Sequence, residues 1–196
     1  MEILYELFGG ESRVKIMRFF LAHPQMTLSE KDIAVRAKVS SVVAERELQA
    51  LKKINFIKQK SLSIDKKKIQ GWHLNSDFPI LHPLRNLLAT QKVFTKQTLA
   101  RRFKNAGKIK LIITSGVFIH EEGSRVDLFV VGDMLKPARI DSVVRSIEAD
   151  LGQELRYATC DTGDFIYRLN AYDRFIRDIL DYPHNVIIDK IGIEGL

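Results

Sequence analysis

The chain has 196 residues with 45% hydrophobic and 28% charged side chains, a composition that is typical of a globular protein with one large or two small domains and argues against disorder. Its net charge is +7, and its single cysteine, Cys160, excludes an internal disulfide and a thiolate metal cluster. The acidic residues near the N-terminus argue against a secretory signal, and the longest apolar stretches fall far short of the roughly 20 residues that a membrane helix needs, so we expect a soluble, cytoplasmic protein without a membrane partner.

Three short helices are predicted near the start of the chain. Apolar residues recur at helical spacing over residues 11–22, and a His-Pro pair follows. Ser29 opens a capping-box-like start for a helix over residues 29–38. After a tight turn, Ser40 caps a third helix over residues 40–54. The expected core positions of the second and third helices are Ile33, Ala34, Ala37, Ala44, Leu48 and Leu51.

The next segment has the pattern of a β-hairpin. Residues 57–64 and 68–74 alternate between apolar and polar side chains, and a lysine-rich tip separates them. Trp72 is expected in the core, where it pins the hairpin to the helices. Three helices followed by a hairpin are the plan of a winged helix-turn-helix, so residues 1–78 are predicted to form a DNA-binding domain.

A longer helix is predicted from Pro83 to about Lys104, within a linker or dimerisation segment over residues 79–107. Its leucines are the candidate contact between two copies of the chain, but they can equally pack within one chain. The apolar positions on one side of this helix are Leu84, Leu87, Leu88 and Phe94.

The remaining residues, 108–196, alternate between strands and helices and complete an α+β fold. Helices are predicted over residues 137–151, with Pro137 near the start, and over residues 163–181. The expected strands are residues 110–118, 126–131 and 154–159, with a last short strand over residues 186–189.

Candidate DNA contacts follow from the geometry of a helix-turn-helix, whose second helix lies in the major groove with its N-terminal residues at the base edges. Ser41 can donate or accept a hydrogen bond, Val42 can contact a thymine methyl, and Glu45 can accept from cytosine N4. Arg46 can reach guanine or a phosphate, whereas lysines further along and at the hairpin tip suit phosphates. The candidate DNA-binding residues are Ser40, Ser41, Val42, Glu45, Arg46, Gln49, Lys52, Lys53, Lys66, Lys67 and Lys68.

These assignments have plainer alternatives. Arg46 can pair with Glu45 or Glu47 and touch no DNA, and the lysine-rich tip can be a solvated turn. The charge distribution suggests a polyanion partner, because residues 1–110 contain 22 Lys and Arg against 9 Asp and Glu, while residues 111–196 contain 9 against 15. A solubilising lysine-rich face is the alternative, and the predicted fold favours double-stranded DNA.

Three segments carry a resemblance to a known family. They are residues 7–21 (LFGGESRVKIMRFFL), 40–58 (SSVVAERELQALKKINFIK) and 72–88 (WHLNSDFPILHPLRNLL). They resemble prokaryotic winged-helix regulators related to the ArsR and MarR types, in which a nucleotidyltransferase-like domain follows the DNA-binding domain. The resemblance covers most of the chain and lies chiefly in the order of the elements. It implies a transcription regulator that binds DNA as a homodimer.

The second half is similar to small nucleotidyltransferases but departs from their metal site. Those enzymes place a Gly-Ser after the first strand and an Asp-x-Asp on the second, because carboxylates must hold two Mg²⁺ ions about 4 Å apart. Here the order is Ser115-Gly116, Asp127 matches the second Asp, and Arg125 stands where the first should be. An arginine repels Mg²⁺, and the strand over residues 154–159 has no acid at its centre. We expect no two-metal catalysis, and no catalytic residue, metal or cofactor is assigned.

Two roles remain for this domain. It can be a structural or dimerising module, or it can bind a phosphate-bearing effector with Arg125 in place of the metal charge. Asp127 is then a vestige paired with Arg125, or an acceptor for a sugar hydroxyl. The candidate effector-binding residues are Ser115, Gly116, Arg125 and Asp127.

The sequence thus predicts an α+β protein with an N-terminal winged helix-turn-helix and a C-terminal nucleotidyltransferase-like α/β domain. The predicted function is a sequence-specific, double-stranded DNA-binding transcription regulator. An active nucleotidyltransferase that uses the winged helix to find its target, and an architectural DNA-binding protein without sequence preference, are the alternatives.

Overall fold

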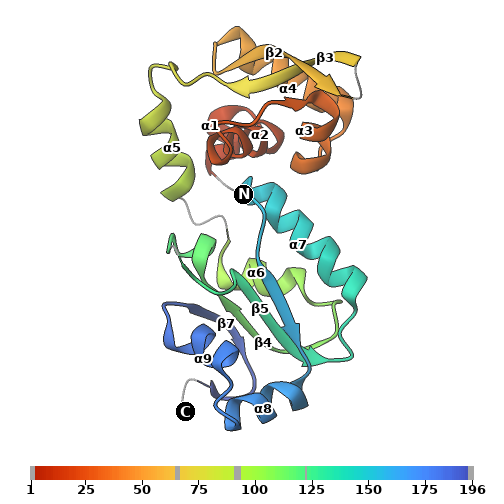
Figure 1. Ribbon diagram of the computed structural model, residues 1–196, viewed down its shortest axis with the longest axis vertical. Coiled ribbons are helices and arrows are strands. Elements are labelled where there is room, and N and C mark those ends of the chain that lie inside the picture. Colours follow the sequence, from red (N-terminus) through yellow and green to blue (C-terminus); the bar gives the residue numbers. More distant parts are fainter. Residues whose placement is uncertain (1–2, 65–66, 91–93, 122, 194–196) are drawn as a thin grey trace. The chain divides into compact units, whose positions relative to one another are not determined.

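The computed structural model describes residues 3–64, 67–90, 94–121 and 123–193, and over these residues the fold is α+β, as predicted (Figure 1). The chain divides into two compact units, Met1–Val93 with Ser146–Gln153, and Phe94–Arg145 with Glu154–Leu196. Within the described ranges, no helix is long and apolar enough to cross a bilayer. The domain limits expected at residues 78 and 107 stay predictions.

The first unit opens with short helices, and the three that the sequence predicts are confirmed. Both predicted caps form: Ser29 Oγ accepts from the N–H of Asp32 at 3.2 Å, and Ser40 Oγ accepts from the N–H of Val43 at 3.4 Å. A first helix of six residues was not predicted, because it is too short to display a period. The helices are α1 (Ile3–Phe8), α2 (Glu11–Ala22), α3 (Glu30–Ala37) and α4 (Ser41–Lys53).

The predicted hairpin is confirmed as strands β2 (Ile57–Ile64) and β3 (Lys67–Leu74), which pair antiparallel from Ile57 opposite Leu74 to Ile64 opposite Lys67. A two-residue strand, β1 (Leu28–Ser29), adds to the other side of β3 and gives the order β1-β3-β2. The sequence did not predict β1, since two residues show no alternation. The hairpin tip at residues 65–66 lies outside the described residues.

The core of the first unit joins these helices to the hairpin. The six core positions predicted for α3 and α4 are all buried, and Trp72 is buried as expected. Each large apolar side chain buried this way contributes about 1.5–3 kcal/mol, so the fold of this unit rests on apolar packing. The cluster includes Val14, Ile16, Phe20, Ile33, Leu48, Leu51, Phe56, Trp72, Leu84 and Leu88.

The single helix predicted from residue 83 to about 104 is wrong. The described residues form two helices, α5 (Leu81–Thr90) and α6 (Lys96–Arg102), with residues 91–93 outside the described part. Thr95 begins α6 because its side chain accepts from the N–H of Thr98, and the side chain of Thr98 accepts in return. Of the predicted leucine stripe, Leu84 and Leu88 are buried in the core of one chain, Leu87 is exposed, and Phe94 lies outside both helices.

The second unit is built on a mixed sheet with the strand order β6-β5-β4-β7. Strand β5 pairs antiparallel with β4 and parallel with β6, and β7 pairs antiparallel with β4. Helix α7 (Pro137–Leu151) makes the connection that the parallel pair requires, over the predicted range. The strands are β4 (Lys108–Thr114), β5 (Leu128–Asp133), β6 (Tyr157–Cys160) and β7 (Asn185–Asp189).

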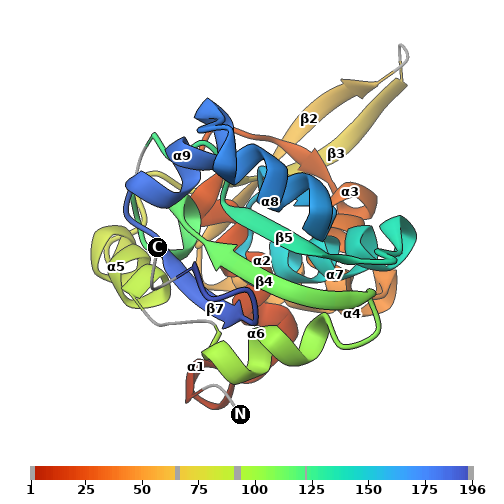
Figure 2. The same cartoon turned by 90° about the horizontal axis from the view of Figure 1, so that it is seen from below.

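Helices α8 (Thr162–Asn170) and α9 (Arg174–Asp181) cover one face of this sheet, and α6 lies beside β7 (Figure 2). The core between helices and sheet contains Leu111, Ile113, Phe129, Val131, Phe165, Ile176 and Ile179.

Three predicted elements of this unit need correction. The helix over 163–181 is two helices, because Tyr172 has a φ of 54° and the side chain of Asp173 caps α9. The first strand ends at Thr114, and Gly116–Phe118 form a 3₁₀ helix, η1. The strand expected over 154–159 runs from Tyr157 to Cys160.

Candidate functional site

Helices α3 and α4 are joined by a tight turn. Lys38 adopts the left-handed conformation with a φ of 51°, and the N–H of Val39 donates to Ala34 O at 3.0 Å. Ser40 then caps α4. Ala34, Ala37 and Ala44 are buried, and small side chains let the two helices approach closely. The turn therefore fixes the angle at which α4 leaves α3.

The outer face of α4 is open to solvent along its length. Val42, in the first turn, is 77% exposed although it is apolar, and Val35 on α3 is exposed as well. Neither valine packs into the core, so both present an apolar side chain to solvent on this surface. The candidate residues on this face are all exposed: Ser40, Ser41, Val42, Glu45, Arg46, Gln49, Lys52 and Lys53.

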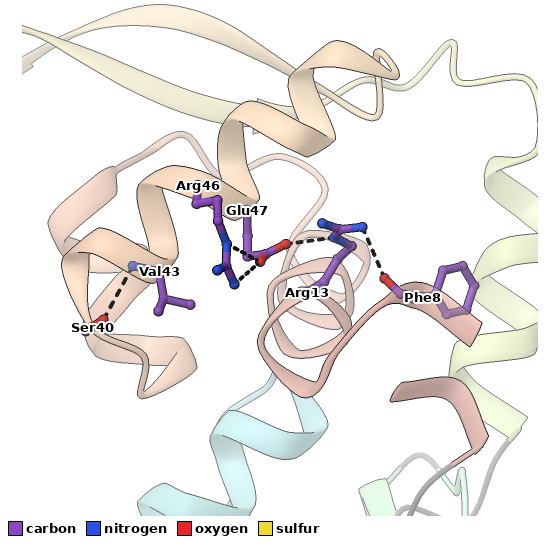
Figure 3. Close-up of polar contacts among 6 residues, drawn as sticks. All are labelled: Phe8, Arg13, Ser40, Val43, Arg46 and Glu47. Atoms are coloured by element: carbon purple, nitrogen blue, oxygen red, sulfur yellow. Dashed lines mark hydrogen bonds and ion pairs between the residues drawn. The ribbon is translucent and has the colours of Figure 1, made fainter. Parts of the chain in front are cut away.

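Arg46 pairs with Glu47, one of the two partners that the sequence allowed (Figure 3). Its Nη2 and Nε donate to Glu47 Oε1 at 2.7 and 3.0 Å. The other oxygen of Glu47 accepts from Arg13 Nε at 2.7 Å, and Arg13 Nη1 donates to the carbonyl of Phe8 at 3.2 Å. A chain of hydrogen bonds thus runs from the end of α1 through α2 to α4.

The electrostatics of this network keep Glu47 ionised. The side chain is only 3% exposed. Burial alone would raise the pKa of Glu47, but the hydrogen bonds and charges of Arg46 and Arg13 outweigh burial, so its pKa lies below its usual 4.5. The side chain of Arg46 is 72% exposed. One edge of its guanidinium is fixed by Glu47, and Nη1 has no hydrogen-bond partner within the described residues.

The lysines near the hairpin differ in what they contact. Lys52 Nζ donates to Gln59 Oε1 at 2.7 Å and lies 6.0 Å from the centre of the Trp72 ring, so this side chain turns toward the hairpin. Lys67 and Lys68 belong to β3, opposite Ile64 and Ser63, and their side chains are not described. Lys66 lies outside the described residues, so the role of the tip stays a prediction.

The structure adds residues that the sequence analysis missed. Arg13 and Glu47 position Arg46, and Val35 extends the exposed face beside the α3–α4 turn. The sequence could have indicated the exposure of Val35, because this residue does not share the helix face of the buried Ile33, Ala34 and Ala37. The link between Arg13 and Glu47 spans 34 residues, and nothing local in the sequence reveals it.

The second candidate site lies where β4 and β5 meet. Asp127 is 1% exposed. Its Oδ1 accepts from the N–H of Val117 at 3.1 Å, and its Oδ2 accepts from the N–H of Arg156 at 2.8 Å. The N–H of Gly116 donates to Ser124 Oγ at 3.0 Å. Gly116 has a φ of +52°, and a Cβ there would come 2.0 Å from Asp127 Oδ1, so only glycine fits beside this carboxylate.

The predicted pairing of Asp127 with Arg125 is wrong. The arginine beside Asp127 is Arg156, whose Nε lies 3.4 Å from Oδ2, while Arg125 Nε lies 3.7 Å from Asp178 Oδ2 on α9. The N–H of Ser115 donates to the carbonyl of Asp127 at 2.9 Å, so Ser115, Gly116 and Asp127 are brought together, while Arg125 pairs elsewhere. In the described part of the chain, no group of three or more His, Cys, Asp or Glu side chains is placed to hold a metal ion.

Comparisons with models of protein families, with curated proteins and with solved structures found no significant match. The resemblance to winged-helix regulators therefore stays a hypothesis, carried by the residues quoted for it.

Proposed function

We propose that the protein is a sequence-specific, double-stranded DNA-binding transcription regulator whose first 78 residues form a winged helix-turn-helix. The observation that carries the proposal is the outer face of α4, with an exposed valine in its first turn and an arginine held by a buried carboxylate beside it. An exposed apolar side chain next to fixed polar groups suits base edges, where thymine presents a methyl group. The tight turn from α3 and the hairpin after α4 complete the arrangement.

Arg46 is prepared for base contact by the way Glu47 holds it. Because Nε and Nη2 face Glu47, the end of the guanidinium that carries Nη1 and the second hydrogen of Nη2 remains for a ligand. That end can donate two parallel hydrogen bonds to O6 and N7 of guanine. Ser41, Val42 and Glu45 would read neighbouring bases, and Lys53 and the lysines of the hairpin tip would contact phosphates.

The second unit, in this proposal, is a nucleotidyltransferase-like domain that has lost two-metal catalysis. The hydrogen bonds of Asp127 support this, because its carboxylate faces two backbone N–H groups and Arg156. A Mg²⁺ ion needs carboxylate oxygens that are free to bind it. The same bonds give Asp127 a structural role in place of an effector contact.

The test is fluorescence anisotropy of the full-length protein with DNA selected from a random pool, compared with a scrambled duplex over a salt series. We expect a preference of about 10³ or more for the selected DNA. Arg46→Ala should weaken binding to the selected duplex, and Arg177→Ala, a matched exposed arginine with an acidic neighbour on α9, should not. No selectable DNA and no binding at low salt would remove the proposal, and equal binding to both duplexes would favour an architectural protein.

The hairpin tip can be tested in the same assay. Replacing Lys66, Lys67 and Lys68 by alanine should flatten the slope of log affinity against log salt by up to roughly 0.9 per lost phosphate contact. An unchanged slope would take the tip off the DNA surface.

A further inference from the structure

A groove with a volume of about 810 Å³ lies in the second unit, between α6 and the adjoining parts of β4 and β7. Its size is within the range of about 300–1,000 Å³ that small-molecule sites occupy. Ala100, Ile109 and Ile188 give it apolar walls. Its cationic lining residues are Arg101, Lys104, Lys108, Lys110 and Lys190.

The charge in this groove has no counterpart on its walls. None of the lining residues is acidic, and residues 94–110 contain six Lys and Arg and no Asp or Glu. Within the described ranges, none of the five cations forms an ion pair with a carboxylate. Cations gathered in one concave site repel one another and create a positive potential that attracts an anion of high charge.

The backbone of β4 is irregular where it lines the groove. The pairing of β4 with β5 shifts between Ile109 and Leu111, so Lys110 is the extra residue of a β-bulge. The carbonyl of Lys110 accepts from the N–H of Lys190 at 2.8 Å, which brings these two cationic residues together from β4 and the end of β7. Bulges often turn side chains toward functional sites.

The geometry points to this groove as the binding site of a small linear polyphosphate, either free or carried by a nucleoside. Lysines from several elements can surround a chain of phosphates, because each ammonium is a compact charge with three donors. The one aromatic lining residue, Phe103, is fully buried, so no ring is open for stacking on a base. The phosphates, and not the base, would therefore supply the affinity. Concave walls suit a small anion better than a rigid duplex.

The effector expected near Arg125 and Asp127 would thus bind at a different place in the same unit. Polyphosphate binding in this groove is independent of DNA binding, because the groove is lined by residues of the second unit alone and the binding is measured without DNA.

The test is isothermal titration calorimetry of the full-length protein with inorganic triphosphate and, separately, with ATP, in magnesium-free buffer at about 0.15 M salt, where screening removes weak surface binding. We expect one site per chain and affinities for the two probes that agree within about threefold, because both present a linear chain of three phosphates. ATP binding without triphosphate binding, or binding of neither probe, would overturn the proposal.

Variants locate the site. Changing Lys104 and Lys190 to glutamine should weaken triphosphate binding by about tenfold or more, and arginine at both positions should retain it. Lys96→Gln is the matched control, since Lys96 is on α6 but outside the groove. All these side chains are exposed, so thermal unfolding should be unchanged. Equal losses in the double variant and the control would overturn the site. A double variant that loses only DNA affinity, in a protein that binds no triphosphate, would assign the groove to nucleic acid instead.

Discussion

Glu47 in the first unit and Asp127 in the second are both buried carboxylates beside an exposed arginine, yet their hydrogen bonds come from different sources. Within the part of the chain that the structure describes, the hydrogen-bond donors to Glu47 are the side chains of Arg13 and Arg46. Asp127 accepts first from the backbone N–H groups of Val117 and Arg156. A carboxylate held by side chains positions those side chains, whereas one held by the backbone fixes the path of the chain.

The largest expected effect is on stability, from Asp127→Asn. The amide NH₂ of asparagine would face one of the two backbone N–H groups, leaving a buried donor without an acceptor. We expect the free energy of unfolding to fall by about 2–4 kcal/mol, measured by urea denaturation. Asp181→Asn, an exposed acid on α9, is the control and should change it by less than about 0.5 kcal/mol. A stability as high as that of the control would show that the backbone does not depend on Asp127.

Compared with Asp127→Asn, Glu47→Gln should lower the stability less and the DNA affinity more. Glutamine keeps one acceptor for the arginines but loses the charge, so we expect a loss of about 1–3 kcal/mol in the free energy of unfolding. DNA affinity should fall by about tenfold in the anisotropy assay, because Arg46 is no longer fixed. Glu121→Gln changes an exposed acid of the second unit and serves as the control. A stability loss with full DNA affinity would reduce Glu47 to a structural residue.

The pH dependence of the Glu47 contribution has a definite sign. Since the folded-state pKa of Glu47 is below its usual 4.5, the carboxylate stabilises the fold fully above pH 4.5. That contribution is lost as the pH falls through the lower folded-state pKa. The difference in unfolding free energy between the native protein and Glu47→Gln should therefore be constant from about pH 6 to 8 and shrink toward acid. A difference that grows toward acid would contradict the network.

The sequence predicts a structural element well when the residues that determine it are close together in the chain. Helices α2 to α4 and the hairpin follow from periodicity and from the caps Ser29 and Ser40, which are all short-range signals. The interruptions at Thr95 and at Asp173 contain no glycine or proline, so periodicity continued across them and the predicted helices were too long. Short-range patterns therefore predict where helices and strands lie, but they miss a helix end that is set only by a polar capping residue.

The site depends on residues that are distant in the chain. Asp127 meets Arg156 from 29 residues away, whereas the sequence offered Arg125 because it stands at the first Asp position of the Asp-x-Asp pair. The cations of the groove come from residues 101–110 and from Lys190, so counting charge along the chain assigned most of them to the half that was predicted to bind DNA. The outer face of α4 was predictable because a single helix supplies it.

The smallest expected effect separates the two arginines. Arg156 is 60% exposed, and Asp127 keeps its backbone donors without it, so Arg156→Ala should change the free energy of unfolding by no more than about 1 kcal/mol. It should leave DNA affinity unchanged, whereas Arg46→Ala should lower that affinity. Anisotropy and urea denaturation of both variants give the four values. If Arg156→Ala weakened DNA binding as much as Arg46→Ala, the second unit would take part in DNA recognition. The contrast between a carboxylate that positions a ligand-binding arginine and one that fixes the chain would then fail.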